Sequence, residues 1–402
     1  MSDTATVATP ALAQTTSQPA GGPFIRHSEP GKARIYDLTN IAYGGLVNQP
    51  LTAVPGYISA FRLRFTATAT QTATQGLAGA NADAPFNCVQ MIQVFDALGT
   101  PIYALPGFEA FKLVPLFSGG FGLYPVADVA NLPSYQPIQT GTAFAGQFQF
   151  ATAIPFEFSK GIGVLGMADG STLPKIQVQF NTASNIFGTA IGTTLPAAAA
   201  IEMRLNADFY WLPAGANVAP PGLGSTRQWF LQQGYPAIAS GGSTATVTIP
   251  RQGGWLDTLI FELRDANNNR QDYWPTILRF KIDGIGEIET NIDEIYDDMA
   301  ITWGVGAVYN NSVTTGSGGT TTAVSPSPRP VGVIAFSRKT SLGRQVLGLL
   351  DTYEVAMSTS AGTSMTVEGA PWATGANGPW TLNALLGQVI PSGALIQGLA
   401  EV

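Results

Sequence analysis

The stretch Gly56–Phe65 (GYISAFRLRF) decides the fold, because a similar stretch, Gly254–Leu263 (GWLDTLIFEL), follows about half a chain later. Each is predicted to form a β-strand, and each then runs into a polar, hairpin-like loop. Two strands of one design at corresponding places indicate that a structural unit occurs twice.

Three further pairs of segments follow in the same order in both halves. They are Val94–Gly99 (VFDALG) with Lys281–Gly286 (KIDGIG), Pro155–Lys160 (PFEFSK) with Ile334–Arg338 (IAFSR), and Val164–Asp169 (VLGMAD) with Val346–Asp351 (VLGLLD). Each match is short, but four matches in one order are the mark of an internal repeat. We therefore expect a tandem duplication of a β domain.

The composition favours short strands joined by turns. The 402 residues include 46 Gly and 28 Pro. Only 11% of the residues are charged, against about 25% in an average globular domain. The chain favours Thr, Val, Phe, Tyr and Ile, which suit a pleated sheet better than a helical bundle. The predicted class is all-β.

The charge balance argues against a direct role in binding nucleic acids. With 19 Lys and Arg against 26 Asp and Glu, the formal net charge is -7, which leaves no basic surface to neutralise phosphates. The low charge also leaves much neutral surface, which stays in solution most easily when part of it is buried against other subunits. The alternative is a surface rich in Thr, Ser, Asn and Gln that dissolves without charge.

The chain divides into an arm, two β domains and a tail. Residues 1–34 lack periodicity and are rich in Thr, Ala, Pro, Ser and Gln, as expected of a flexible N-terminal arm. The first domain is expected over 35–213 and the second over 226–390, with a C-terminal tail over 391–402. Residues 214–225 are rich in Pro and Gly and are interpreted as the linker.

No secretory signal and no membrane span are predicted. The N-terminus carries Asp3 and lacks a basic run followed by an apolar one. No stretch of about 18 uninterrupted apolar residues occurs. We expect the protein to be made in the cytoplasm.

Short helices are expected to interrupt the strands at matching places. In the first pair, one helix is expected between Phe158 and Ile176, and its counterpart is expected over Thr340–Leu350. The other pair is Gly107–Leu113 and Glu287–Met299, the latter with apolar residues on one helical face and Asp and Glu on the other.

Several segments of the first domain carry a resemblance to a known family. They are Phe148–Phe158, the helix-loop Gly161–Lys175, the strand Ile176–Phe180 ending in Asn181, and the strand Met203–Trp211 running into Pro213. With two successive sandwiches of about eight strands each, the chain resembles the double jelly-roll major capsid proteins of tailless icosahedral viruses, above all those of membrane-containing, tectivirus-like bacteriophages. The insert Asn310–Pro330 and the apolar tail Leu382–Val402 depart from that pattern.

The resemblance implies a structural virion protein without catalytic activity. The implied fold is two tandem jelly-roll β-sandwiches, a double jelly roll, with short helices in loops. Such proteins form homotrimers in which six jelly rolls make a pseudo-hexagonal capsomer, and many capsomers tile an icosahedral shell. The implied partners are other copies of the chain, penton and minor capsid proteins, and an internal membrane reached by the arm or the tail. The implied location is the capsid, after synthesis in the host cytoplasm.

Few residues could support catalysis. The only histidine is His27 in the arm, and Cys88 stands alone, so histidine-based catalytic sites, disulfides and paired-cysteine zinc sites are excluded. We expect Cys88 to be a small core residue. A glycosidase needs only two carboxylates, and its best candidates are Asp257, Glu262, Asp265 and Asp272. We interpret these four as solvated residues of strands and turns.

Two acidic segments resemble cation sites in part. Asp265–Asp272 (DANNNRQD) begins like a calcium loop but lacks the glycine at the sixth place and the glutamate at the twelfth, so a polar hairpin is expected. The acidic face of Glu287–Asp298 could bind divalent cations between subunits, but a solvated helix face is the simpler interpretation. No catalytic residue, cofactor-binding residue or metal ligand is assigned.

Six of the seven tryptophans lie in the expected second domain, over 226–390: Trp229, Trp255, Trp274, Trp303, Trp372 and Trp380. They could form a face that stacks on carbohydrate, but we expect core and interface anchors. Two alternatives to a major capsid protein remain. One is a two-domain β-sandwich that binds or cleaves glycans, and the other is a minor capsid or spike protein of similar fold.

Overall fold

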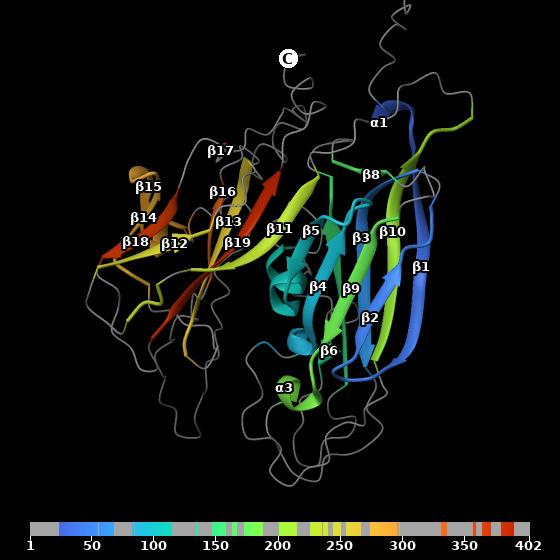
Figure 1. Cartoon of the computed structure of the whole chain (residues 1–402), viewed down its shortest axis with the longest axis horizontal. Helices are drawn as coiled ribbons and strands as arrows, with labels where there is room; N and C mark the ends of the chain where they lie inside the picture. Colours follow the sequence, from blue (N-terminus) through green and yellow to red (C-terminus); the bar gives the residue numbers. More distant parts are fainter. Residues whose placement is uncertain are drawn as a thin grey trace, which may run out of the picture.

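Strands dominate the structure, a computed structural model, and form two sandwiches that lie side by side along its longest axis (Figure 1). It describes residues 24–54, 56–67, 83, 85–114, 134–135, 147–157, 163–166, 173–187, 201–214, 226–234, 236–239, 244–250, 255–266, 274–295, 297, 331–335, 357–358, 364–370 and 379–389.

The first sandwich has two sheets. One has the order β1-β10-β3-β7-β6, with β8 also paired to β3, and the other contains β2, β9, β4 and β5 in that order. The strands are β1 Glu29–Ile41, β2 Leu46–Pro50, β3 Tyr57–Ala67, β4 Val89–Phe95, β5 Pro101–Leu105, β6 Ser134–Tyr135, β7 Phe148–Pro155, β8 Leu165–Gly166, β9 Lys175–Phe180 and β10 Ile201–Trp211.

The second sandwich repeats this plan. One sheet contains β11, β19, β13 and β16, with β17 paired to β13, and the other has the order β12-β18-β14-β15. The strands are β11 Arg227–Gln233, β12 Ala245–Ile249, β13 Trp255–Arg264, β14 Ile277–Ile282, β15 Ile285–Thr290, β16 Val331–Ala335, β17 Met357–Ser358, β18 Met365–Ala370 and β19 Thr381–Val389.

Both sandwiches have the same connectivity. Apart from the two-residue strands β6, β8 and β17, the first, eighth, third and sixth strands of each sandwich form one sheet. The second, seventh, fourth and fifth form the other, which is the jelly-roll arrangement of two packed four-stranded sheets. The all-β double jelly roll expected from the sequence is confirmed.

The predicted repeat is visible in the strands. Three of the four matched pairs of segments fall on β3 and β13, on the hairpins β4–β5 and β14–β15, and at the ends of β7 and β16. The first member of the fourth pair contains β8, and its partner, Val346–Asp351, lies outside the described residues. The structure therefore shows the duplication that the short matches suggested.

One parallel strand pair joins the two sandwiches. The last strand of a sheet in the first sandwich, β5, pairs with β11, which begins the second sandwich; Trp229 lies opposite Tyr103, and Phe230 lies opposite Ala104. Through this pair, β2, β9, β4 and β5 continue into β11, β19, β13 and β16 as a single nine-stranded sheet that includes β17.

Aromatic side chains fill the core of the first sandwich. The rings of Phe111 and Phe150 meet edge to face with centroids 4.5 Å apart, and the ring of Phe65 lies 5.3 Å from that of Phe111. All three side chains are buried. From Phe61 to Ala67, β3 buries every second residue, and β7 does so from Phe148 to Thr152, as half-buried strands do.

The expected extent of the N-terminal arm was partly wrong, and two of the expected helices fall largely or wholly outside the described residues. The arm does not extend to residue 34, because α1 (Phe24–His27) and β1 already form there, and Phe24 packs edge-on against Tyr57. Of the stretch between Phe158 and Ile176, where a short helix was expected, only residues 163–166, which contain β8, and 173–175 are described, and the rest lies outside the described residues. The helix expected over Thr340–Leu350 lies outside the described residues.

The expected acidic helix Glu287–Met299 was wrong over its first residues, which form the end of β15. Asp283 (φ 51°) and Gly284 (φ 79°) make a two-residue turn of positive φ that returns the chain antiparallel to β14. Residues 292–295 are helical, and Asn291 caps them: its Oδ1 accepts a hydrogen bond from the Glu294 amide, and the Glu294 carboxylate accepts one from the Asn291 amide.

The helix expected over Gly107–Leu113 is present, as the π-helix η2 (Glu109–Leu113). Two further short helices, η1 (Phe86–Cys88) and α3 (Ala183–Phe187), lie at one end of the first sandwich and contact each other. Among the described residues, no helix is long and apolar enough to span a membrane.

Candidate functional site at the joint between the two sandwiches

A buried charged cluster lies where the two sandwiches meet. Arg264, at the end of β13, donates hydrogen bonds to three carboxylates: Asp83 at 2.7 Å, Glu262 at 2.6 Å and Glu109 at 3.2 Å. All four side chains are almost completely inaccessible to solvent. Asp83 and Glu109 belong to the first sandwich, so the cluster connects segments far apart in the sequence.

Local structure explains how these four residues come together. Glu262 and Arg264 stand two residues apart on β13 and therefore project from the same face of the strand. Glu109 is the first residue of η2, which directly follows the joint strand β5. Asp83 precedes η1, and the ring of Phe108 lies 6.0 Å from the guanidinium of Arg264.

Burial makes the charges of this cluster interdependent. Burial, and then the nearby Glu109 carboxylate, raise the pKa of Glu262 well above its usual value, although Arg264 acts in the opposite direction. The second oxygen of Glu262, Oε2, is buried without a hydrogen-bond partner among the described residues, which disfavours its ionised form. Burial lowers the pKa of Arg264, but the three carboxylates outweigh this effect and raise it.

The joint is also closely packed. The indole of Trp229 on β11 is buried and lies opposite Gly387 of β19. A Cβ atom on Gly387 would come within 2.8 Å of the indole, so only glycine leaves room for the ring. Tyr103, the partner of Trp229 across the joint, is likewise buried.

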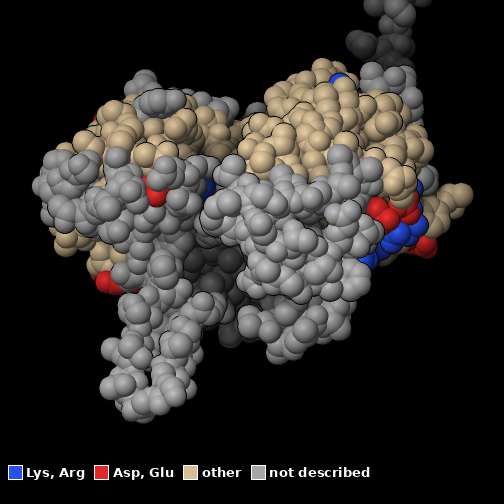
Figure 2. All heavy atoms as spheres, turned by 90° about the horizontal axis from the view of Figure 1, so that it is seen from below, with Lys and Arg blue, Asp and Glu red and all other residues tan. Residues whose placement is uncertain are grey.

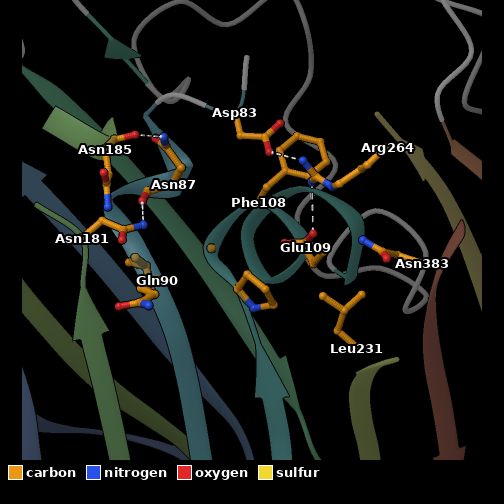
Figure 3. A pocket seen from close by; sticks show the side chains of 13 residues that line it. Asp83, Asn87, Gln90, Phe108, Glu109, Asn181, Asn185, Leu231, Arg264 and Asn383 are labelled. Carbon is orange, nitrogen blue, oxygen red and sulfur yellow. Dashed lines mark hydrogen bonds and ion pairs between the residues drawn. The ribbon is translucent and has the colours of Figure 1, made fainter. Parts of the chain in front are cut away.

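A cavity of about 410 Å³ adjoins the charged cluster and is lined by both sandwiches (Figure 3). Its walls carry mainly side-chain amides together with Arg264, Glu109 and Asp83. The amide residues are Asn87, Gln90, Asn181, Asn185 and Asn383. Two of them are held in place by the backbone: Asn87 donates to the Asn185 carbonyl, and Asn181 donates to the Asn87 carbonyl.

Of the four carboxylates proposed for a glycosidase, only Glu262 and Asp265 can be placed with their side chains. Glu262 and Asp265 were expected to be solvated, and this was wrong: both are buried, and Glu262 is bound by Arg264. The backbone of Asp257 lies in β13, and Asp272 lies outside the described residues. Glycoside hydrolysis requires two carboxyl groups that reach a sugar. The buried cluster instead joins two domains.

The other candidates for chemistry behave as structural residues. Cys88 is buried in the core, as expected, and burial raises the pKa of its thiol well above the usual value. His27 is exposed on α1. In the described parts of the chain, no three His, Cys, Asp or Glu side chains lie together as ligands for a metal ion. Of the segment Asp265–Asp272, only residues 265 and 266 are described.

Three of the six tryptophans can be placed with their side chains. Trp229, Trp274 and Trp380 are buried, which confirms the expected role as core anchors for these three. The side chain of Trp255, together with Trp303 and Trp372, lies outside the described part of the structure.

A second charged region lies on the outer face of β1, β10 and β3. Arg204 binds Asp37 at 3.1 Å, and Arg62 binds Asp208 on the neighbouring strand. Figure 2 shows Lys, Arg, Asp and Glu gathered at the end of the molecule where β1 lies in Figure 1. Unlike the cluster at the joint, these side chains reach solvent, with Arg62 and Arg204 at 44% and 42% exposure.

Comparison with known proteins identifies the fold. No protein-family model matches the sequence, and no curated protein matches it. The structure is similar to the crystal structure of the STIV major capsid protein, with a TM-score of 0.61, 11% identity, and coverage of 93% of this chain and 100% of that one. A second similar structure, from the atomic structure of Sulfolobus Turreted Icosahedral Virus, has a TM-score of 0.59 and 12% identity and covers 93% and 96% of the two chains.

A third similar structure comes from the quasi-atomic model of the PBCV-1 virus capsid. Its TM-score is 0.58 at 12% identity, and the match covers 90% of this chain and 93% of that one. The likeness extends over both sandwiches and nearly the whole length of each known protein. This chain therefore has the double jelly-roll fold found in viral major capsid proteins.

Proposed function

We propose that this chain is a structural virion protein, a major capsid protein that forms homotrimeric, pseudo-hexagonal capsomers tiling an icosahedral shell. The observation that carries the proposal is the match of both sandwiches together, over at least 90% of this chain and of each of the three capsid proteins compared. Fold alone does not establish function, so the joint and the surface must also suit a shell.

The joint suits a protein that must hold its shape. A parallel strand pair, a buried indole and a buried ion cluster fix the second sandwich against the first. An interface with such buried groups is stiffer than the polar contacts that usually separate mobile domains. The two sandwiches are thus presented to neighbouring subunits as one unit.

The surface suits burial against other subunits. Only 11% of the residues are charged, and several apolar side chains lie exposed at strand ends and turns. Leu98 is 89% exposed in the β4–β5 turn, and Ile285 is 67% exposed beside the β14–β15 turn, the same place in both sandwiches. Single exposed apolar side chains are common on protein surfaces, so the low fraction of charged residues is the stronger support for burial against other subunits.

The proposal includes domain limits, partners and location. The expected limits are 35–213 and 226–390 for the two jelly rolls, 214–225 for the linker and 391–402 for the tail. Because α1 and β1 already belong to the first jelly roll, we place its start at residue 24 and the end of the arm at residue 23. Partners would be further copies of the chain, penton and minor capsid proteins, and an internal membrane contacted by the arm or tail. The protein would be made in the host cytoplasm and reside in the capsid.

The glycan-binding alternative loses three of its six tryptophans, because Trp229, Trp274 and Trp380 are buried and cannot stack on a sugar. A minor capsid or spike protein differs from a major one in copy number within the particle.

The mass of the purified chain in solution, from light scattering behind a sizing column, tests the proposal. We expect three times 42.0 kDa, with larger assemblies at high concentration. A monomer at all concentrations would contradict it. If larger assemblies form, electron microscopy of them should show hexagonal capsomers.

A further inference from the structure

The two jelly rolls can be matched residue by residue, because the same irregularities occur in both. The pairing of β3 with β10 has a register shift at Ser59, and the pairing of β13 with β19 has one at Asp257. The first two residues of each strand pair with a short extra strand, β8 or β17. The residue after each shift, Ala60 or Thr258, pairs with the sixth strand of its sandwich.

These shared features align the faces of the two strands. Counting from Tyr57 and Trp255, which begin β3 and β13, Arg64 matches Glu262. On the neighbouring strands, Arg204 lies opposite Arg64, and Asn383 lies opposite Glu262. Arg64 and Arg204 therefore occupy, in the first sandwich, the places that Glu262 and Asn383 occupy at the joint.

The matched faces differ in burial. On β13, the residues from Thr258 to Arg264 are buried on both faces, and so are those of β19 from Ala384 to Val389. On β3 from Phe61 onward and on β10, residues of one face are buried, and those of the other are exposed or half-buried. The first sandwich covers the outer face of β13. On the outer face of β3 and β10, Phe24 of α1 covers only the end at Tyr57 and Tyr210, and Arg64 stays exposed.

The segment that covers β13 also occurs twice. Glu109, which binds Arg264, stands four residues after the end of β5 at Leu105. Glu294 stands four residues after the end of β15 at Thr290 and likewise lies in a short helical segment. Around Glu294, the side chains of Asp293 and Asp297 are also exposed and acidic.

We propose that the outer face of β3 and β10 docks a second copy of this chain, which places its segment 291–297 there with Glu294 directed toward Arg64 and Arg204. This inference rests on the proposed capsomer and specifies the contact by which copies join. The contact between copies would repeat the arrangement that joins the two sandwiches within one chain, with η2 replaced by the acidic segment of the neighbour.

Charge complementarity supports this occupant. Five of the chain's 19 basic residues project from the outer face of β1, β10 and β3, and they are Lys32, Arg34, Arg62, Arg64 and Arg204. The same face carries three carboxylates, Asp37, Glu202 and Asp208, so basic side chains exceed acidic ones by five to three. The incoming segment carries three exposed carboxylates and no Lys or Arg. Opposite potentials on two surfaces that meet favour their association and fix its register.

Within one chain, the segment 291–297 lies too far from the outer face of β3 and β10 to bind there. In Figure 1 the strands β1 and β15 lie at opposite ends of the longest axis, so the two surfaces belong to different copies. Each is the edge strand of its sheet among the described strands. A head-to-tail contact of this kind is heterologous, and it produces a closed ring when the rotation between copies closes.

Charge reversal in the full-length protein tests the contact. Arg64 is exposed and has no ion pair in the described structure, so Arg64→Glu should leave the fold intact. We expect Arg64→Glu to raise the dissociation constant of the trimer by about tenfold or more, because it places a carboxylate against an acidic segment. Arg26→Glu, an exposed change of equal charge on α1, is the matched control and should leave the constant unchanged.

A second variant separates charge from helix capping. Glu294→Gln can still accept the capping hydrogen bond from Asn291 but loses the charge, and it should weaken the trimer less than Arg64→Glu does. The combined variant Arg64→Glu with Glu294→Lys restores opposite charges in every contact of the ring. It should therefore recover trimers that Arg64→Glu loses.

The outcomes distinguish the contact from the capsomer. Unchanged trimers in Arg64→Glu would overturn the proposed contact while leaving the capsid function standing. Loss of trimers in Arg64→Glu without recovery in the combined variant would overturn the pairing with segment 291–297. A monomeric wild-type protein would overturn both proposals. Circular dichroism and thermal unfolding of each variant verify that the chain is folded.

Discussion

Arg264 and Asp83 stand 181 residues apart in the chain and meet at 2.7 Å across the joint between the two jelly rolls, both almost completely buried. Removing the guanidinium would leave Asp83, Glu109 and Glu262 buried together without a cation. We expect Arg264→Met to lower the free energy of unfolding by about 3–5 kcal/mol. Denaturant unfolding of purified protein measures this change.

The exposed pair of Arg279 with Glu289 supplies the control for that prediction. Their atoms are 2.6 Å apart, but the carboxylate is 61% exposed. Arg279 also binds Glu368 at 3.1 Å, but its side chain reaches solvent, so Arg279→Met should lower the free energy of unfolding much less than Arg264→Met does. Equal losses in the two variants would show that the buried cluster does not hold the joint.

The raised pKa of Glu262 predicts a pH dependence of stability. Below the unfolded pKa, about 4.3, both folded and unfolded forms are protonated, and the stabilising contribution is complete. As the pH rises, the unfolded form ionises first, so stability is lost until the pH passes the folded pKa. Glu262→Gln cannot ionise and should not show this loss.

The measurement is the difference in unfolding free energy between Glu262→Gln and wild type at pH 4 and at pH 8. We expect the difference to move in favour of the variant at pH 8, by up to about 1.4 kcal/mol for each pH unit between the two pKa values. Glu109, Asp83 and Arg264 face Glu262 and remain in both proteins. A difference that is the same at both pH values would contradict the assigned shift.

Gly387→Ala should destabilise the joint. The added Cβ would lie 2.8 Å from the indole of Trp229, which is buried and has little room to move. Overpacking of this kind costs about 1–3 kcal/mol. In the background Trp229→Phe, the smaller ring should tolerate Gly387→Ala at a lower cost, and thermal unfolding of the four proteins measures the coupling. Strict additivity would argue against the clash.

Phe111 is expected to anchor η2 in the aromatic core. Its ring contacts those of Phe65 and Phe150, so Phe111→Ala should cost about 3–5 kcal/mol in denaturant unfolding. Leu98→Ala, at an apolar residue that is 89% exposed, should change the free energy by less than about 0.5 kcal/mol. A small loss for Phe111→Ala would mean that η2 is held chiefly by the backbone.

Much of the architecture could be predicted from local patterns. The strand Ile201–Trp211 alternates apolar and polar residues, and the structure places the first set inward. The matched segments identified β3 with β13 because the two strands have the same role in each sandwich. Residues 287–290 were predicted to be helical because the apolar residues there have helical spacing. The Asp283-Gly284 turn instead makes them pair with β14.

The charged cluster at the joint could not be predicted. Glu262 and Arg264 are polar residues on a strand whose other face is apolar, which is the ordinary pattern of a solvated strand. Their burial depends on Asp83 and Glu109, which belong to the other sandwich and lie beside them where β5 pairs with β11. Sequence spacing contains no signal for contacts set by the packing of two domains.

The parallel pairing of β5 with β11 has a mechanical consequence. A continuous sheet transmits strain along its hydrogen bonds, so the two jelly rolls move as one rigid body and not as two hinged domains. A shell assembled from such chains would bend at the contacts between copies, while each chain kept its own curvature. Pressure from packed contents would therefore open the contacts between neighbours before it separated the two halves of any one molecule.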